Sequence, residues 1–128
     1  MMFTEEQRVA VWQKAQPVEG LDPSMYRKDA CGAWMVWDKY GVQDNMYGWE
    51  IDHIVPRSLL QEKGYMPSEI DSLINLRALQ HQNNVSKGDD YPSYTAMVTA
   101  EANRNVERMQ NLTVNEKLRN QLKQHFQL

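Results

Sequence analysis

Residues 49–56 read WEIDHIVP, and residues 74–87 read INLRALQHQNNVSK. The first segment alternates apolar and polar residues and stops at Pro56, which is typical of a short, half-buried strand. The second begins with a brief apolar alternation and then turns polar, which predicts a second strand that leads directly into a polar helical turn. Two strands followed at once by a helix are therefore the expected centre of the fold.

Asp52 and His53 are adjacent on the first of these strands, so their side chains should point to opposite faces. They can serve one site only if the strand ends or twists there. An amide-rich helix packed back across them would complete a small, oxygen-rich metal site with a free histidine beside it.

This order of residues resembles the HNH endonuclease family. The family motif is a histidine, usually preceded by Asp or His, then Asn-Leu, then His or Asn nine positions after that asparagine, with a lysine close behind. Here His53, Asn75 and Asn84 fill those positions, and Lys87 follows. The match is close from residue 49 to residue 87 and looser upstream. Asp-His alone is common in proteins, but the four elements in this order and at this spacing are specific.

The resemblance implies a fold and its extent. It predicts a small α+β domain spanning residues 1–128, with a ββα-metal core, also called an HNH or His-Me finger, at about residues 49–90. Flanking hairpins and helices near the two ends complete the expected domain. A hairpin is predicted from residues 33–38 and 47–54, and another from residues 94–100 and 106–112.

The resemblance also implies a role for each motif residue. His53 would be the general base that takes a proton from water, and an imidazole suits this task because it exchanges a proton near neutral pH. Asp52 and Asn84 would hold one divalent ion, and Asn75 would hydrogen-bond the intervening loop and so fix His53. Oxygen ligands favour Mg²⁺ or Mn²⁺ over zinc. The expected activity is metal-dependent hydrolysis of phosphodiester bonds in DNA.

Four further side chains are candidates for substrate binding, but each has an ordinary alternative. Arg57, Arg77 and Lys87 either contact phosphates or are solvated surface cations. His81 lies three residues before Asn84, so on a helix the two share a face, and His81 either contacts the substrate or approaches the metal. Because an acidic nuclease must gather cations near its cleft, we expect the three cations to lie on the same face as His53.

Many relatives in this family bind a structural zinc ion through two Cys-x-x-Cys pairs, and this chain departs from them. Gln80 and Asn83 occupy the positions of the second pair, and only Cys31 resembles part of the first. No structural zinc is therefore expected, and packing must replace it. Clustered tryptophans are the candidates for this packing, with a base-stacking surface as the alternative. They are Trp34, Trp37 and Trp49.

Composition limits the class of protein. A chain of 128 residues with 41% hydrophobic and 24% charged residues is one ordinary globular domain, with no apolar run long enough for a membrane span. The single cysteine cannot form an internal disulfide, which fits a cytoplasmic location. The net charge of −3 argues mildly against a nucleic-acid partner.

Two other functions compete with the endonuclease. One is a catalytically silent nucleic-acid-binding module, which a disrupted motif would favour, whereas every motif position is filled here. The other is a toxin or effector nuclease domain whose main contact is an immunity partner. The sequence leaves open whether the protein is a monomer or a homodimer, and which form of DNA it cleaves.

Local patterns predict helices near both ends. Thr4-x-x-Gln7 is a capping-box pattern, and the first helix is expected to run over residues 5–16 and to end before Pro17. A helical turn is expected after Pro67. Thr113-x-x-Glu116 predicts the start of the last helix, along which an apolar stripe repeats every four residues. The stripe consists of Val114, Leu118, Leu122 and Phe126.

Overall fold

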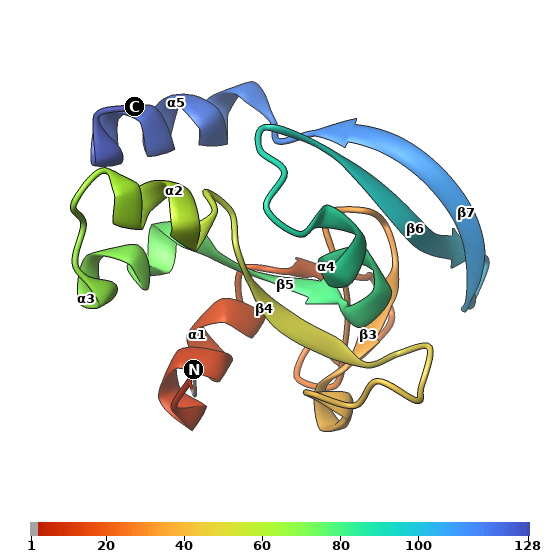
Figure 1. Cartoon of the computed structure of the whole chain (residues 1–128). Coiled ribbons are helices and arrows are strands. Elements are labelled where there is room, and N and C mark those ends of the chain that lie inside the picture. Colours follow the sequence, from red (N-terminus) through yellow and green to blue (C-terminus); the bar gives the residue numbers. More distant parts are fainter. Residues whose placement is uncertain (1–2) are drawn as a thin grey trace.

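The computed structural model describes residues 3–128, which form an α+β domain with antiparallel hairpins and a helix near each end (Figure 1). The helices are α1 (Glu5–Trp12), α2 (Arg57–Glu62), α3 (Pro67–Ile70), α4 (His81–Lys87) and α5 (Glu116–Phe126), with single turns η1 (Trp37–Lys39) and η2 (Leu73–Asn75). The strands are β1 (Gln16–Pro17), β2 (Tyr26–Lys28), β3 (Trp34–Val36), β4 (Trp49–His53), β5 (Leu76–Gln80), β6 (Ser93–Glu101) and β7 (Arg104–Thr113). No helix among residues 3–128 is both long and apolar enough to cross a membrane.

The centre of the fold is the unit formed by β4, β5 and α4. The two strands pair antiparallel, with Asp52 opposite Arg77 and His53 opposite Leu76. Helix α4 follows β5 without a break, because the Gln80 side chain accepts hydrogen bonds from the backbone amides of Gln82 and Asn83 and so caps the helix. The strand–strand–helix order expected from the sequence is present.

The two faces of β4 are covered by different helices (Figure 1). Trp49 and Ile51 belong to a buried cluster that includes Val11 and Trp12 from α1. Asp52, which points the other way, contacts Lys87 on α4. Because α1 and α4 lie on opposite faces, adjacent residues of β4 reach different environments.

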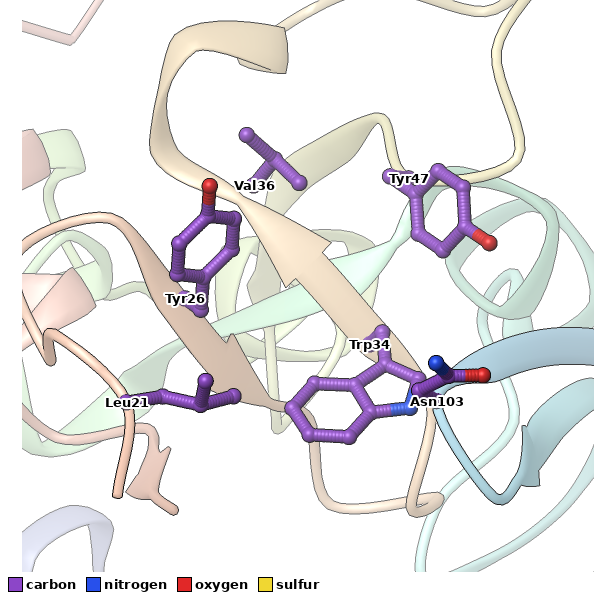
Figure 2. Close-up of a pocket in the computed structure, with 6 residues that line it drawn as sticks. All are labelled: Leu21, Tyr26, Trp34, Val36, Tyr47 and Asn103. Atoms are coloured by element: carbon purple, nitrogen blue, oxygen red, sulfur yellow. The ribbon is translucent and has the colours of Figure 1, made fainter. Parts of the chain in front are cut away.

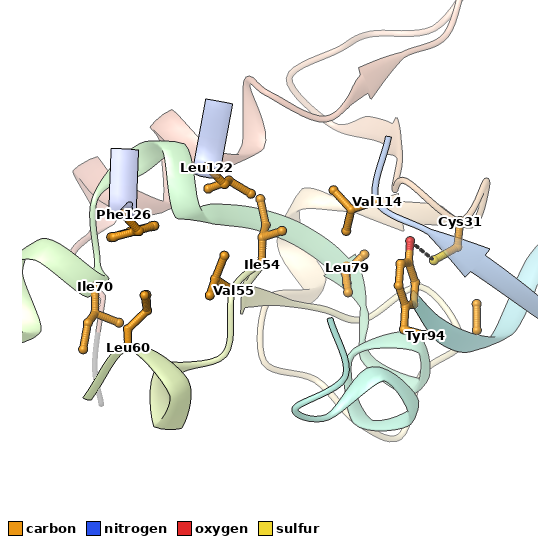
Figure 3. Close-up of a cluster of buried hydrophobic side chains, with 11 residues drawn as sticks. Cys31, Ile54, Val55, Leu60, Ile70, Leu79, Tyr94, Val114, Leu122 and Phe126 are labelled. Carbon is orange, nitrogen blue, oxygen red and sulfur yellow. Dashed lines mark hydrogen bonds between the residues drawn. The ribbon is translucent and has the colours of Figure 1, made fainter. Parts of the chain in front are cut away.

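A second buried cluster joins α5 to the region after β4 (Figure 3). Leu122 and Phe126 of α5 pack with Ile54, Leu60 and Ile70, all at most 1% exposed. The predicted apolar stripe on the last helix is therefore confirmed. Packing of this cluster holds α2 and α3 in place. Arg57 is the first residue of α2, and Asp71 is the C-cap residue of α3.

Asp29 forms a buried polar network that connects distant segments. One carboxylate oxygen accepts hydrogen bonds from the backbone amides of Cys31 and Ala33, and the other from the Gln80 amide and the Asn83 side chain. The Asn83 side chain in turn bonds both the N–H and the C=O of a β6 residue, Val98. One carboxylate thus joins the loop after β2 to α4, and through α4 to β6.

The predicted end of the first helix is wrong. Helix α1 ends at Trp12 instead of continuing to residue 16, because residues 16–17 pair with β2 as β1. The Arg27 side chain donates to the carbonyls of Gln13 and Ala15 in the segment that follows α1. The predicted capping box at Thr4 and Gln7 is confirmed.

The predicted hairpin between residues 33–38 and 47–54 is also wrong. Strand β3 pairs with β2, and β4 pairs with β5. A single backbone hydrogen bond, from Val36 to the Tyr47 carbonyl, links the two segments. Apolar alternation predicts a strand but not the strand with which it pairs. Here β5, the partner of β4, follows the short helices α2 and α3 in the chain.

The other predicted hairpin, at residues 94–100 and 106–112, is confirmed as β6 and β7, and α3 is the expected turn after Pro67. The start of the last helix differs from the prediction. Asn115 caps α5 through its side chain, whereas Thr113 still pairs with Ser93 at the end of β7. A residue held in a strand cannot also cap the helix that follows.

Candidate functional site

A pocket of about 240 Å³ lies beside β4 and α4. It is lined by residues from both faces of β4, which places it along the edge of that strand. Four of the residues singled out from the sequence meet there: Asp52, His53, Arg57 and Asn84. The pocket is completed by Ile51, Pro56, Gly88 and Asp89.

His53 is the last residue of β4, and its ring is held by a carboxylate. The Nε2 atom lies 2.6 Å from Oδ1 of Asp71, and both side chains are 17% exposed. Asp71 is the C-cap residue of α3. Because an ionised carboxylate only accepts hydrogen bonds, Nε2 carries the proton in this contact and Nδ1 keeps the free lone pair. The arrangement therefore selects one tautomer of His53.

The segment that follows His53 is fixed by Asn75, which is fully buried. Its side-chain oxygen accepts a hydrogen bond from the Val55 amide at 2.8 Å, and its nitrogen donates to the carbonyls of Val55 and Ile70 at 3.2 and 3.1 Å. Ile70 directly precedes Asp71. One amide thus holds the loop after His53 and the end of the helix that presents Asp71.

Asp52 is 4% exposed and lies between two buried cations. Arg77 Nε is 3.1 Å from Oδ2, and Lys87 Nζ is 3.2 Å from Oδ1. Lys87 also donates to the His53 carbonyl at 3.1 Å. Burial lowers the pKa of Lys87, and the charge of Asp52 opposes that change. This triad carries a net positive charge behind the pocket.

The triad changes the interpretation of two predicted phosphate contacts. Arg77 is 9% exposed and Lys87 is 1% exposed, and neither lines the pocket. Both cations bind Asp52, which points to the other face of β4 from His53, and only Lys87 also reaches the His53 backbone carbonyl. The geometry gives them the task of neutralising a buried carboxylate, and does not bring either one against a bound phosphate.

Arg57 is the cation that reaches the pocket. It is the first residue of α2, and its Nε is buried without a hydrogen-bond partner among residues 3–128. An unpaired buried N–H is unfavourable unless a ligand completes it. His81, in contrast, is 8% exposed and does not line the pocket, so the structure does not bring this predicted contact to the site.

The donor atoms in the pocket suit a hard divalent cation. Asn84 donates its amide N–H to Glu50 at 2.9 Å, which leaves its oxygen for another ligand. Each Asp52 oxygen keeps a further lone pair after its contact with Arg77 or Lys87. No group of three or more His, Cys, Asp or Glu side chains within residues 3–128 is arranged to hold a metal. A metal held by Asp52 and Asn84 would therefore have only two protein ligands.

Sequence reasoning missed Asp71. It lies four residues before Asn75 in a stretch predicted only as a helical turn, and its partner His53 is 18 residues away. An Asp near a motif asparagine is a weak signal, because Asp is common at helix ends and turns. Only the tertiary arrangement identifies it.

Two of the three tryptophans take the predicted packing role. Trp37 and Trp49 pack with Trp12, with ring centroids 5.0 to 5.7 Å apart. Trp34 is half-buried and belongs to neither core cluster. The packing prediction is confirmed for Trp37 and Trp49 only.

Comparison with family models, with curated proteins and with solved structures found no match to this chain. The resemblance to HNH endonucleases therefore rests on the sequence motif alone.

Proposed function

We propose that the protein is a metal-dependent HNH-type endonuclease that hydrolyses phosphodiester bonds in DNA. The observation that carries the proposal is the pocket beside β4, which is lined by His53, held by Asp71, together with Asp52, Asn84 and Arg57. These residues offer the three functions that phosphodiester hydrolysis requires: a base, charge stabilisation and a phosphate anchor.

In this proposal, Nδ1 of His53 takes a proton from the attacking water as the water oxygen bonds to phosphorus. The bond from phosphorus to the 3′ oxygen then breaks, and the departing oxygen takes a proton from solvent water. The imidazolium that forms keeps its Nε2–H bond to Asp71, whose negative charge stabilises it. Asp71 thus stabilises the protonated form of His53, which exists only after proton transfer.

Phosphate binding falls to Arg57 and to the metal ligands. The guanidinium of Arg57, which lines the pocket, would donate to a non-bridging phosphate oxygen, with charge assistance. Asp52 and Asn84 would hold a divalent ion, Mg²⁺ or Mn²⁺, which supplies charge stabilisation at the phosphate. Because Arg77 and Lys87 offset the charge of Asp52, we expect weak metal binding.

The test is incubation of the protein with supercoiled plasmid in the presence of Mg²⁺ or Mn²⁺, with and without EDTA. We expect metal-dependent conversion to nicked or linear DNA, and loss of that activity in His53→Ala. The matched control is His125→Ala, because His125 is an exposed histidine on α5. Cleavage that persists equally in both variants would contradict the assignment. Binding of DNA without cleavage under any of these ions would favour the silent module.

A further inference from the structure

Trp34 lies on an exposed face of the hairpin formed by β2 and β3. In the register of this hairpin, Lys28 is opposite Trp34 and Tyr26 is opposite Val36. Side chains alternate along a strand, so these four share one face, while Met35 points inward and is fully buried. The outer face therefore presents two aromatic rings and a cation where a solvated strand usually carries polar residues.

This face forms one wall of a pocket of about 330 Å³ (Figure 2). Tyr47, from the segment just before β4, and Asn103, from the turn between β6 and β7, form the other wall. The Trp34 indole N–H donates to the Ala102 carbonyl at 3.0 Å, which fixes the orientation of its ring. The Trp34 ring is therefore held in one orientation at the pocket, whose lining is completed by Leu21.

We propose that this pocket binds an unpaired nucleobase of the DNA substrate. Base stacking on aromatic side chains is a general mode of single-strand binding, since every base has a flat face. The Trp34 ring offers such a platform, the rings of Tyr26 and Tyr47 add aromatic surface around it, and Asn103 lies beside Trp34. The volume suits one flat ring system.

Charge favours a nucleotide over an apolar peptide as the occupant. The Lys28 ammonium lies over one face of the Trp34 ring, 4.6 Å from its centre, so a base would stack on the other face. A cation beside a stacking platform is positioned to contact the phosphate of the nucleotide that stacks there. An apolar peptide side chain would use the ring but would leave this cation without a counter-charge.

The pocket also lies within reach of the proposed catalytic site. Tyr47 precedes His53 by six residues, so the two are separated by at most about 20 Å of extended chain. A few nucleotides of single strand span such a distance. The inference rests on the proposed function for the identity of the substrate. It adds that the preferred DNA would contain unpaired nucleotides near the cleaved bond.

The experiment measures binding of a fluorescein-labelled single-stranded oligothymidylate by anisotropy, with EDTA present so that no cleavage occurs. Trp34→Ala should weaken binding about 5- to 100-fold, the usual effect of removing one stacking ring. Trp34→Phe should retain most of the affinity, because it keeps a ring but loses the hydrogen bond to Ala102. Met109→Ala, at a 70% exposed site on β7, is the control and should bind as wild type does. Thermal melting of each variant reports whether it is folded.

Three results would overturn the inference. Equal binding by wild type and a folded Trp34→Ala protein would show that the ring is not used. An equal loss in Trp34→Phe and Trp34→Ala would show that the bond to Ala102 matters, and not stacking. A wild-type dimer that becomes monomeric in Trp34→Ala would identify a second copy of the chain as the occupant. Failure of the proposed function is distinguishable, because plasmid cleavage by wild type would then be absent while oligothymidylate binding still depends on Trp34.

Discussion

Replacing Asn75 by alanine tests whether the segments around His53 depend on one buried amide. The substitution removes three hydrogen bonds and leaves the amide of Val55, itself fully buried, without a partner. An unsatisfied buried donor costs about 1–3 kcal/mol. The carbonyls of Val55 and Ile70 add less, because carbonyl oxygens tolerate a lost partner better than amides do. We therefore expect the free energy of unfolding to fall by about 2–4 kcal/mol.

Urea denaturation followed by tryptophan fluorescence measures this change, since Trp49 is fully buried in the native state. The same loss should lower Tm by roughly 10 °C. The control is Asn111→Ala, which removes an exposed asparagine whose side chain bonds only the Thr95 hydroxyl, at 3.2 Å. That variant should stay within about 0.5 kcal/mol of wild type.

The activity of Asn75→Ala should fall as well, while its metal affinity stays near the wild-type value. The reason is that the loop after His53 and the end of α3, which presents Asp71, both lose their anchor. If Asn75→Ala lowered the free energy of unfolding no more than Asn111→Ala does, this reasoning would be refuted. The buried amide would then contribute no more to stability than an exposed one.

Three further predictions concern the site. His53→Ala should reduce plasmid cleavage about 10²–10⁴-fold, and excess Mg²⁺ or Mn²⁺ should not restore it. Part of the defect of Asn84→Ala should recover as the metal concentration is raised. Rescue of His53→Ala by metal would instead identify His53 as a metal ligand. Asp71→Ala should change the ratio of His53 tautomers seen by ¹⁵N NMR, while Asp71→Asn, which keeps an acceptor oxygen, should preserve the Nε2–H form; a ratio unchanged in Asp71→Ala would exclude a positioning role. EDTA should abolish cleavage but leave Tm nearly unchanged, and a large drop would reveal a structural ion.

The parts of the fold that local pattern determines were predictable from the sequence. The capping box at Thr4, the hairpin of β6 and β7, and the apolar stripe on α5 each depend on residues a few positions apart. The order β4, β5, α4 was predictable for the same reason. Pairing between distant strands was not, because the alternation in β3 and β4 suits several partners and the choice depends on how α1, α2 and α3 pack.

The candidate site was predictable as a set of residues but not as a set of contacts. Asp52, His53, Arg57 and Asn84 do line one pocket. The motif could not show that Arg77 is turned inward against Asp52, because a basic residue on a strand has the same local sequence whether it faces solvent or a buried acid. Burial depends on the tertiary structure, and for this reason Arg77, which was expected to contact phosphate, forms an ion pair with Asp52 instead.

The network around Asp29 shows how the fold can hold its α4 helix without cysteine ligands. Gln80 and Asn83 stand at the positions where many relatives of the resembled family carry zinc-binding cysteines, and both bond to Asp29. Burial raises the pKa of Asp29, and four hydrogen bonds to its carboxylate oppose that rise. In sequence, Asp29 lies in a short polar turn, and its partners are 51 and 54 residues away. Since α4 also carries Asn84, a carboxylate that does no chemistry fixes the helix on which the proposed metal site depends.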